Sequence, residues 1–383
     1  MSDRITSSHS VITSLAFEER GDDVYEIDFL PVGDGERGGD AIAMRFGTQL
    51  TPQQQKVVVL DGGTQESGAS LVSHIQMYYK TNVVDLAVCT HSDSDHACGL
   101  MEVLEKLNVS RLAMHLPWNH AANIDDLFKD PKINEDKLKR RFKKSLDNAH
   151  QLEQLAKKKG IEILEPFSDA TQTDDILVVL GPSQKFYEEL LLSFRGAPEA
   201  AVRSPFAPKF VEAVKDAIKW VVENWGFETL SEPDLNASSA ENNSSLILLF
   251  KDGNDRFLFT SDAGVPALAG ALDVAKRIGV DLKTVKGLQV PHHGSKHNVG
   301  PAVLNLILGP KNSQEQYGKT AIVSAPAKGE PRHPSRKVVN AFMRRGARVY
   351  ATKGNTIWQH SSDVPARGWG DANPLPFSGQ VEE

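Results

Sequence analysis

The stretch Thr90-His91-Ser92-Asp93-Ser94-Asp95-His96 places two histidines and two aspartates within six residues. It lies at the end of the apolar run Val83–Thr90, which is predicted to be a buried strand, and the spacing of apolar residues over Gly99–Leu107 predicts a helix. At a tight turn between a strand and a helix, side chains in this pattern can converge on two metal ions about 3.5–4 Å apart. We therefore expect the fold to be organised around this turn.

The four acidic and imidazole side chains of the turn are candidate metal ligands. We expect His91 and Asp93 to bind one divalent ion, and Asp95 and His96 to bind the other. Two ions at that spacing share a hydroxide and stabilise a hydrolytic transition state. The simpler alternative is that the serines and aspartates only cap the following helix. Capping does not require the two flanking histidines, which favour the metal site.

The composition is that of a soluble globular protein. The chain has 383 residues, of which 40% are hydrophobic and 24% charged, and its net charge of −7 argues against a generic nucleic-acid-binding surface, although not against a local basic track. Its two cysteines, Cys89 and Cys98, do not suggest a disulfide framework. No apolar run reaches the roughly eighteen residues of a membrane span, and the first residues lack the apolar core of a secretory signal. We expect a cytoplasmic protein with no membrane partner.

Strand-like runs occupy two parts of the chain and flank a largely helical middle. The runs are Val24–Leu30, Ala41–Phe46, Lys56–Leu60, Val83–Thr90 and Arg111–Leu116, then Leu246–Phe250, Arg256–Thr260, Leu288–Val290, Ala321–Val323 and Val349–Tyr350. This order predicts an α+β sandwich of two β-α halves with an insertion between them. The division is a flexible tail over 1–20, a first half over 21–116, the insertion over 117–241 with some core strands at 161–180, a second half over 242–360 and a tail over 361–383.

The insertion carries the most basic stretch of the chain. Asp136–Lys159 is predicted to be one helix with an apolar face, and its other face carries Lys137, Lys139, Arg140, Arg141, Lys143, Lys144, Lys157, Lys158 and Lys159. These charges either follow a nucleic-acid backbone or are simply solvated, because acidic residues interrupt them. A further helix is predicted over Phe210–Trp225. An insertion of this size also suits a protein partner or a homo-oligomer surface.

Further motifs follow in order along the chain. They are Leu60-Asp61-Gly62-Gly63, Asn242-Asn243-Ser244-Ser245-Leu246, Thr260-Ser261-Asp262, Pro291-His292-His293-Gly294-Ser295 and Arg332-His333-Pro334-Ser335. With the first turn, they resemble the metallo-β-lactamase fold hydrolases, and most of all the soluble domain of the DNA-uptake competence proteins (the ComEC type). Those proteins carry the same change to aspartate that Asp93 makes in the signature His-x-His-x-Asp-His. The sequence lacks their membrane-spanning part, so we expect a free-standing relative.

The resemblance implies an αββα sandwich that holds a two-metal site. It implies that Asp262 bridges the ions and that one of His292 and His293 completes the shell of the second ion. We favour His292, which is nearer the end of the strand. The residues expected to take part in catalysis are Asp95, His293 and His333, and those expected to bind the substrate are Ser295, Asn242, Ser245 and Lys296. His333 is equally suited to capping the helix that begins near Ser335.

One departure concerns the third ligand of the first ion. In the family this ligand is a separate histidine between the first turn and the bridging aspartate, whereas His115, His120 and His150 in that interval are not part of a Gly-His-Thr turn. The alternatives for the position are Asn242, Asn243, Ser245 and water. A shell rich in oxygen shifts the preference from zinc toward manganese or magnesium. Zinc and manganese are the expected ions, and magnesium is possible.

The sequence therefore predicts a metal-dependent hydrolase. Because two divalent ions stabilise both the attacking and the leaving oxygen of a phosphodiester, the first hypothesis is a phosphodiesterase or nuclease that cleaves DNA through a metal-bound hydroxide, as the resemblance implies. A second hypothesis is a hydrolase of a lactone, thioester or cyclic nucleotide, since the fold does not determine the chemistry. The third is a non-catalytic binding module on the same fold.

Overall fold

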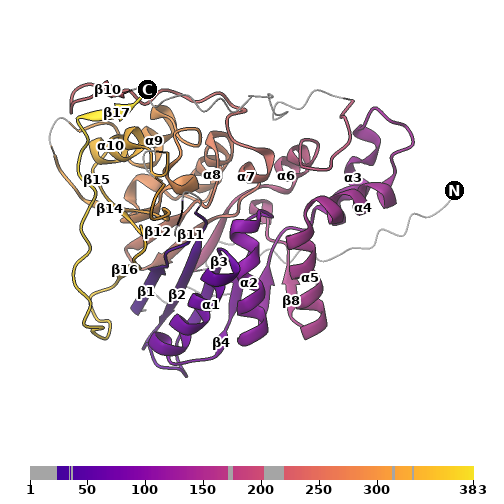
Figure 1. Ribbon diagram of the computed structural model, residues 1–383, viewed down its shortest axis with the longest axis horizontal. Coiled ribbons are helices and arrows are strands. Elements are labelled where there is room, and N and C mark those ends of the chain that lie inside the picture. Colours follow the sequence, from indigo (N-terminus) through magenta and orange to yellow (C-terminus); the bar gives the residue numbers. More distant parts are fainter. Residues whose placement is uncertain are drawn as a thin grey trace.

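Two stacked β-sheets with helices on both outer surfaces form the body of the protein (Figure 1). The computed structural model describes residues 24–33, 35, 38–170, 176–201, 220–312, 315–329 and 332–383, so the predicted tail over 1–20 lies outside the described residues. The predicted αββα sandwich is thereby confirmed. Within the described part of the chain, no helix combines the length and apolar character that crossing a membrane requires.

The first sheet has the strand order β16-β1-β2-β3-β5-β7-β8. Its strands are β1 (Val24–Phe29), β2 (Ala41–Gly47), β3 (Lys56–Gly62), β5 (Leu86–Val88), β7 (Arg111–Ala113), β8 (Glu162–Leu164) and β16 (Ile357–His360). From β3 to β8 the neighbouring strands run parallel. Because parallel neighbours need crossover connections, helices join them, namely α1 (Gln65–His74) with its extension η1 (Ile75–Tyr79), α2 (Ser94–Lys106) and α5 (Asp147–Lys159).

The second sheet has the order β15-β14-β13-β12-β11-β9. Its strands are β9 (Leu177–Gly181), β11 (Ile247–Asp252), β12 (Asp255–Phe259), β13 (Gly287–Gln289), β14 (Lys319–Val323) and β15 (Ala347–Ala351). The helices that connect its parallel strands are α8 (Val265–Arg277), α9 (Pro301–Ile307) and α10 (Arg336–Arg344). Two short pairs lie outside these sheets, β4 (Val83–Val84) with β6 (Asn108–Val109), and β10 (Trp220–Val222) with β17 (Gln380–Glu382).

Alternation along the strands builds the core between the sheets. In β11, Leu248 and Phe250 belong to the cluster between the two sheets, whereas Ile247 and Leu249 belong to the cluster under the outer helices. Successive side chains of a strand point to opposite faces, so a strand covered on both faces has the continuous apolar run seen over Leu246–Phe250. The sandwich is therefore held by apolar burial on both sides of each sheet.

A close approach between α2 and the end of β3 depends on glycine. A Cβ atom at Gly99 would lie 1.8 Å from the carbonyl oxygen of Gly62. We expect Gly99→Ala to lower the free energy of unfolding by about 1–3 kcal/mol, the usual cost of overpacking, as measured by urea denaturation. The matched control is Gly270→Ala in α8, where a Cβ atom would meet nothing within 4 Å and a gain of roughly 0.5–1 kcal/mol is expected. Equal stability of the Gly99→Ala protein and the wild type would contradict the packing.

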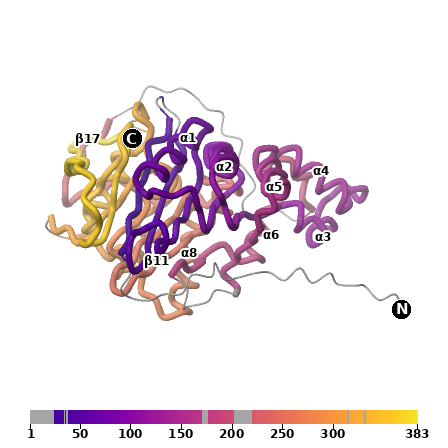
Figure 2. The backbone as a smooth tube through the Cα atoms, turned by 90° about the horizontal axis from the view of Figure 1, so that it is seen from below, coloured from indigo at the N-terminus to yellow at the C-terminus, as the bar shows by residue number. Residues whose placement is uncertain are grey.

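The insertion forms a lobe beside the first sheet (Figure 2). Its elements are η2 (Pro117–His120), α3 (Ala121–Ile124), η3 (Asp125–Leu127), α4 (Glu135–Ser145), α5, η4 (Ser168–Ala170), α6 (Gln184–Leu191) and α7 (Ala240–Asn243). The basic stretch is two helices rather than the predicted single one, because the backbone of Leu146 (φ −115°, ψ 48°) leaves the helical region between α4 and α5.

The prediction of a helix over Phe210–Trp225 is wrong at its C-terminal end. Trp220–Val222 forms β10, which pairs antiparallel with β17 near the C-terminus. Residues 210–219 lie outside the described residues. The partner strand is remote in sequence, so local spacing alone does not indicate the pairing. The C-terminal segment over 361–383, predicted to be a tail, thus contributes a strand. The amide of Leu375 in this segment also donates to the carbonyl oxygen of Val349, at 2.8 Å.

Candidate metal centre

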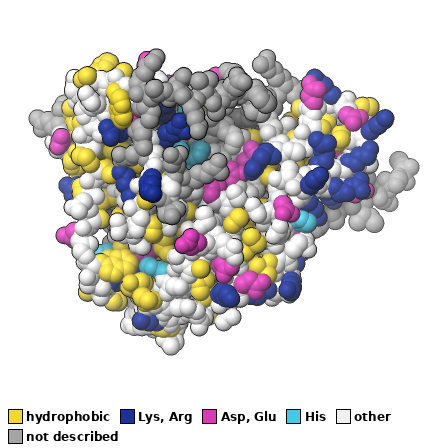
Figure 3. Space-filling model, in the orientation of Figure 1, with side chains coloured by type: hydrophobic (Ala, Val, Ile, Leu, Met, Phe, Trp, Pro, Cys, Tyr) yellow, Lys and Arg dark blue, Asp and Glu magenta, His cyan; other side chains and the backbone are white. Residues whose placement is uncertain are grey.

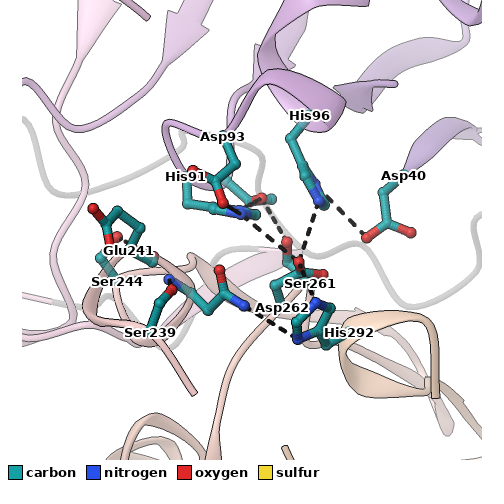
Figure 4. Close-up of polar contacts among 12 residues, drawn as sticks. Asp40, His91, Asp93, His96, Ser239, Glu241, Ser244, Ser261, Asp262 and His292 are labelled. Carbon is teal, nitrogen blue, oxygen red and sulfur yellow. Dashed lines mark hydrogen bonds and ion pairs between the residues drawn. The ribbon is translucent and has the colours of Figure 1, made fainter. Parts of the chain in front are cut away.

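Side chains from strand ends of both sheets meet at one edge of the sandwich (Figure 4). His91 follows β5 in the first sheet, and His96 lies in the first turn of α2. Asp262 follows β12 in the second sheet, and His292 and His293 follow β13. The carboxyl ends of parallel strands lie on the same edge of a sheet, which is where α/β folds place their ligands. Stacking of the two sheets then brings both sets of residues together.

The Asp262 carboxylate lies at the centre of this group. Its Oδ2 atom is 3.5 Å from His96 Nε2, 3.6 Å from His292 Nε2 and 3.9 Å from His91 Nε2, and its Oδ1 atom is 3.8 Å from His293 Nε2. The carboxylate side chain is only 4% exposed. One buried carboxylate therefore faces four imidazole rings, an arrangement that suits a ligand between two ions.

The imidazole rings are oriented by partners on their far sides. His96 Nδ1 lies 2.8 Å from Asp61 Oδ2, and His293 Nδ1 lies 2.9 Å from the carbonyl oxygen of Ser324. Because both partners only accept hydrogen bonds, each Nδ1 atom carries a proton, so that in the neutral ring the lone pair is on Nε2 and faces the centre. Such an outer partner is the usual companion of a histidine that binds a metal ion.

The inward-facing atoms fit a metal ion. Within the described residues, the buried atoms without a hydrogen-bond partner include His91 Nε2, His96 Nε2, His293 Nε2, Asp262 Oδ1 and both carboxylate oxygens of Asp40. Leaving buried polar atoms unpaired is costly, and lone pairs that face one another are stabilised by a cation. The groups whose ligand atoms lie within 4.8 Å of one another are His91–His96–Asp262, Asp95–His96–His293, Asp40–Asp262–His293 and Asp40–Asp61–His96.

These groups distinguish the two adjacent histidines. His293 takes part in two groups and is buried, whereas His292 takes part in none and its side chain is 28% exposed. Both residues have left-handed backbones, with φ of 54° at His293 and 46° at His292. The geometry thus favours the reverse of the predicted division: we propose His293 as the ligand of the second ion and His292 as the residue that faces the substrate.

Asp40 and Asp61 lie beside His96, and neither is predicted from the sequence to have a role. Asp61 accepts hydrogen bonds from the amide and hydroxyl of Thr90, at 2.8 and 2.6 Å, and pairs with His96. Asp40 is 1% exposed, and its Oδ2 atom lies 3.8 Å from His96 Nδ1. Each is an aspartate beside a glycine, Asp40 directly before β2 and Asp61 near the end of β3, and this pattern is the signal in the sequence that points to them.

The charges of the centre are strongly coupled. Burial alone would raise the pKa of Asp262, but His292, His96 and His293 hold it well below its usual value. Burial would likewise lower the pKa of His96, but Asp262 and Asp61 raise it well above the ordinary range. The pKa of Asp40 is raised, chiefly by burial. The carboxylates and imidazoles therefore stabilise one another only in the presence of positive charge, from protons or from metal ions.

The outer part of the site contains His292, Asn242 and His333. His292 Nδ1 lies 2.8 Å from Asn298 Oδ1 and 3.1 Å from Asn242 Nδ2. The His333 ring stacks on that of His292 with centroids 5.9 Å apart, and burial, together with His293 and His292, lowers the pKa of His333 to about 4. The side chain that caps α10 is Ser335, which accepts from the Val338 amide, so His333 does not have that role.

Two of the other predicted substrate-binding residues, Ser295 and Lys296, have partners of their own. Ser295 is buried, and its hydroxyl accepts from the amide of His297 at 3.3 Å. Lys296 Nζ donates to the carbonyl oxygen of Glu383 at 2.7 Å. Ser245 is fully buried, and its hydroxyl oxygen has no hydrogen-bond partner in the described part of the chain. None of these contacts tests a role in substrate binding, which stays a prediction.

Among the described residues, none of the three histidines considered for the third ligand belongs to the ligand groups. His115 Nε2 is 2.7 Å from the carbonyl oxygen of Pro166, and burial lowers its pKa to about 4. His120 Nδ1 lies 2.9 Å from Glu188 and its Nε2 atom 3.5 Å from Glu165. These two carboxylates raise the pKa of His120 to about 9 against the effect of burial. His150 Nε2 lies 3.2 Å from Gln154 Nε2 on α5.

Comparison with known proteins gives matches to one family. Residues 50–311 match the family model described as the metallo-beta-lactamase superfamily. The chain is 29% identical over 220 residues to ComE operon protein 3 of Bacillus subtilis (strain 168), an alignment that covers 52% of this chain and 26% of that protein. The matched part of the chain thus corresponds to only 26% of that relative's length.

Solved structures resemble the fold at low sequence identity. Unliganded yeast PDE1 is 13% identical, with a TM-score of 0.41 over 87% of this chain and 99% of that one. A putative metallo-beta-lactamase from Thermotoga maritima is 10% identical, with a TM-score of 0.30 over 62% of this chain and 79% of that one.

Proposed function

Because the chain belongs to the metallo-β-lactamase superfamily, we propose that it is a metal-dependent phosphodiesterase that cleaves DNA at the site around Asp262. The observation that carries the proposal is the position of the Asp262 carboxylate between His91 and His96 on one side and His293 on the other. Two divalent ions, when bound, would supply Lewis-acid stabilisation of a phosphodiester and lower the pKa of water.

The chain's own residues would hold the ions in two groups. His91 and Asp262 would bind the first ion together with Asp93, which belongs to none of the groups above but has its Oδ2 atom 3.8 Å from His91 Nε2. Asp95, His96, His293 and Asp262 would bind the second. Asp61 and the Ser324 carbonyl group orient the rings of His96 and His293, respectively, through hydrogen bonds. Burial of Asp262 keeps water from competing for its oxygens. A set this rich in carboxylates suits manganese or magnesium as well as zinc.

Two features favour a DNA substrate. The motifs resemble those of competence proteins that take up DNA, and the insertion lobe bears exposed cations that include Lys137, Arg140, Arg141 and Lys144. Figure 3 shows dark blue Lys and Arg side chains gathered over this lobe, at the right of the surface. Clustered cations of this kind bind the phosphate backbone and make the affinity depend on salt. Other cations of the lobe are neutralised locally, as Lys139 is by Glu135.

The test is a substrate panel with defined metals. Purified protein stripped with EDTA and reloaded with Mn²⁺, Mg²⁺ or Zn²⁺ is assayed on single- and double-stranded DNA, RNA, cyclic nucleotides, bis-p-nitrophenyl phosphate, a lactone and a thioester. We expect metal-dependent cleavage of DNA and of the chromogenic diester. Cleavage of cyclic nucleotides, the lactone or the thioester without cleavage of DNA would replace the proposal with a small-substrate hydrolase. A protein that binds none of the three metals would contradict it altogether.

A further inference from the structure

Arg195 reaches the candidate metal centre from the insertion. It follows α6, and its guanidinium group forms an ion pair with Oδ1 of Asp93, the residue that departs from the His-x-His-x-Asp-His signature. These two residues are 102 positions apart in the sequence. The Arg195 side chain is 58% exposed and that of Asp93 27% exposed. An isolated pair at such a surface would contribute little to stability, so its position beside the centre calls for another explanation.

The backbone around Arg195 is held from two sides. Its amide donates to Oε1 of the buried Glu241 at 2.6 Å, and its Nε atom lies 3.4 Å from the same oxygen. Its carbonyl oxygen accepts from the hydroxyl of Ser145 at the end of α4, at 2.7 Å. Arg141 donates to the next carbonyl oxygen, that of Gly196, at 2.7 Å. The guanidinium group is thereby positioned in advance rather than left to sample the surface.

The two oxygens of Asp93 have different neighbours. Oδ1 faces Arg195, whereas Oδ2 lies 3.8 Å from His91 Nε2, on the side of the centre (Figure 4). A carboxylate that ligates a metal ion is commonly held by a hydrogen bond to its other oxygen. The ion pair with Arg195 would therefore fix the carboxylate with Oδ2 directed at the first ion.

The charges of the pair explain why aspartate is accommodated at this position. Replacing a neutral histidine by an aspartate adds a negative charge to a centre that already contains the buried carboxylates of Asp40, Asp61 and Asp262. Arg195 adds a compensating positive charge outside the centre. On the basis of the metal centre proposed above, we infer that Arg195 is a positioning residue for Asp93, and that the Asp93–Arg195 pair stands in for the second histidine of the signature.

Metal binding by the apo protein tests this inference without reference to activity. Titration calorimetry with Mn²⁺ alone is expected to show two binding events in the wild type. Arg195→Ala should weaken one of them by about 10–100-fold, the usual effect of removing an outer partner of a ligand, and leave the other unchanged. Arg195→Lys should restore part of the affinity, because it retains the charge but not the planar fork. The control is Arg140→Ala, an exposed cation on α4, which should change neither event.

A double-mutant cycle identifies Asp93 as the residue through which Arg195 acts. Asp93→Ala alone should weaken the same binding event, and adding Arg195→Ala should cause little further loss, because coupled residues are not additive. In an Asp93→His protein, where the ligand no longer needs a cation, Arg195→Ala should leave Mn²⁺ affinity unchanged. Unfolding midpoints of all variants show that each protein is folded.

Other outcomes would overturn the inference in recognisable ways. If Arg195→Ala leaves both Mn²⁺ affinities intact and raises only the KM for bis-p-nitrophenyl phosphate, Arg195 contacts the substrate and does not position Asp93. Additive losses in the cycle would show that the two residues act independently. Failure of the wild type to bind Mn²⁺, Mg²⁺ or Zn²⁺ would contradict the proposed function itself, a result distinct from both.

Discussion

Asp262→Asn is expected to lower the rate of phosphodiester cleavage by about 10³-fold, equivalent to the several kcal/mol that metal ions contribute to stabilising a transition state. The substitution keeps the size of the side chain but removes the charge that faces His91, His96, His292 and His293. An amide is a much poorer ligand than a carboxylate for two ions at once. The metal content of the reloaded protein, measured by mass spectrometry, should fall along with the rate.

The matched control is Asp273→Asn, which removes a carboxylate from the exposed surface of α8. This variant should retain the metal content and rate of the wild type. Full activity in the Asp262→Asn protein would mean that cleavage occurs at another site or comes from a contaminant. Loss of activity with the metal content intact would instead assign Asp262 a role in the reaction other than holding the ions.

Arg367→Ala is expected to lower the free energy of unfolding by about 3–5 kcal/mol, the cost of removing one partner from a buried ion pair. Arg367 comes from the C-terminal segment, and its side chain is only 4% exposed. It donates to both oxygens of Asp28, at 2.7 and 3.0 Å, and lies 2.9 Å from Glu26. Rings of Trp358, Trp369 and Tyr78 surround the guanidinium carbon at 4.6, 4.9 and 5.0 Å.

The size of this loss of stability depends on the partners that the carboxylates of Glu26 and Asp28 retain. Without Arg367, Glu26 still pairs with Arg45, and Asp28 keeps His74 at 3.0 Å and the Tyr79 hydroxyl at 2.7 Å. Both carboxylates would nevertheless be buried with less positive charge. Chemical denaturation measures the loss, and Arg140→Ala, which removes an exposed arginine, is expected to cost much less. A loss in Arg367→Ala no larger than in this control would show that the C-terminal segment is dispensable for folding.

Much of the candidate centre can be predicted from local sequence because its candidate ligands follow short apolar runs. His91, Asp93, Asp95 and His96 lie in one turn, and any strand ending there presents them at a sheet edge. Asp262 follows the apolar run of β12 in the same way. The placement of these side chains depends only on where each strand ends and which residues follow it, and both can be read from the sequence pattern. The αββα sandwich is predicted from the order of the motifs along the chain, which resembles that of the family.

The roles that we propose for His292 and His293 rest on the backbone conformation. From the sequence, His292 is the favoured ligand because it lies nearer the end of the strand. Left-handed backbone at both positions turns His293 toward Asp40 and Asp262 and leaves His292 near the surface. Asp40 and Asp61 are found in the same way, because only the packed structure shows that the buried Asp40 carboxylate has no hydrogen-bond partner among the described residues and that Asp61 lies behind His96.

The sequence by itself determined the family, the layered fold and the turn from His91 to His96, because each motif and each strand is a short run of neighbouring residues and the motifs follow one another in a characteristic order. Only the tertiary structure decided which side chains from elsewhere in the chain lie beside that turn. The pairing of Asp93 with Arg195 and of β10 with β17 joins segments remote in sequence. Such contacts arise from the packing of the insertion and of the C-terminal segment against the sandwich, and no local periodicity encodes them.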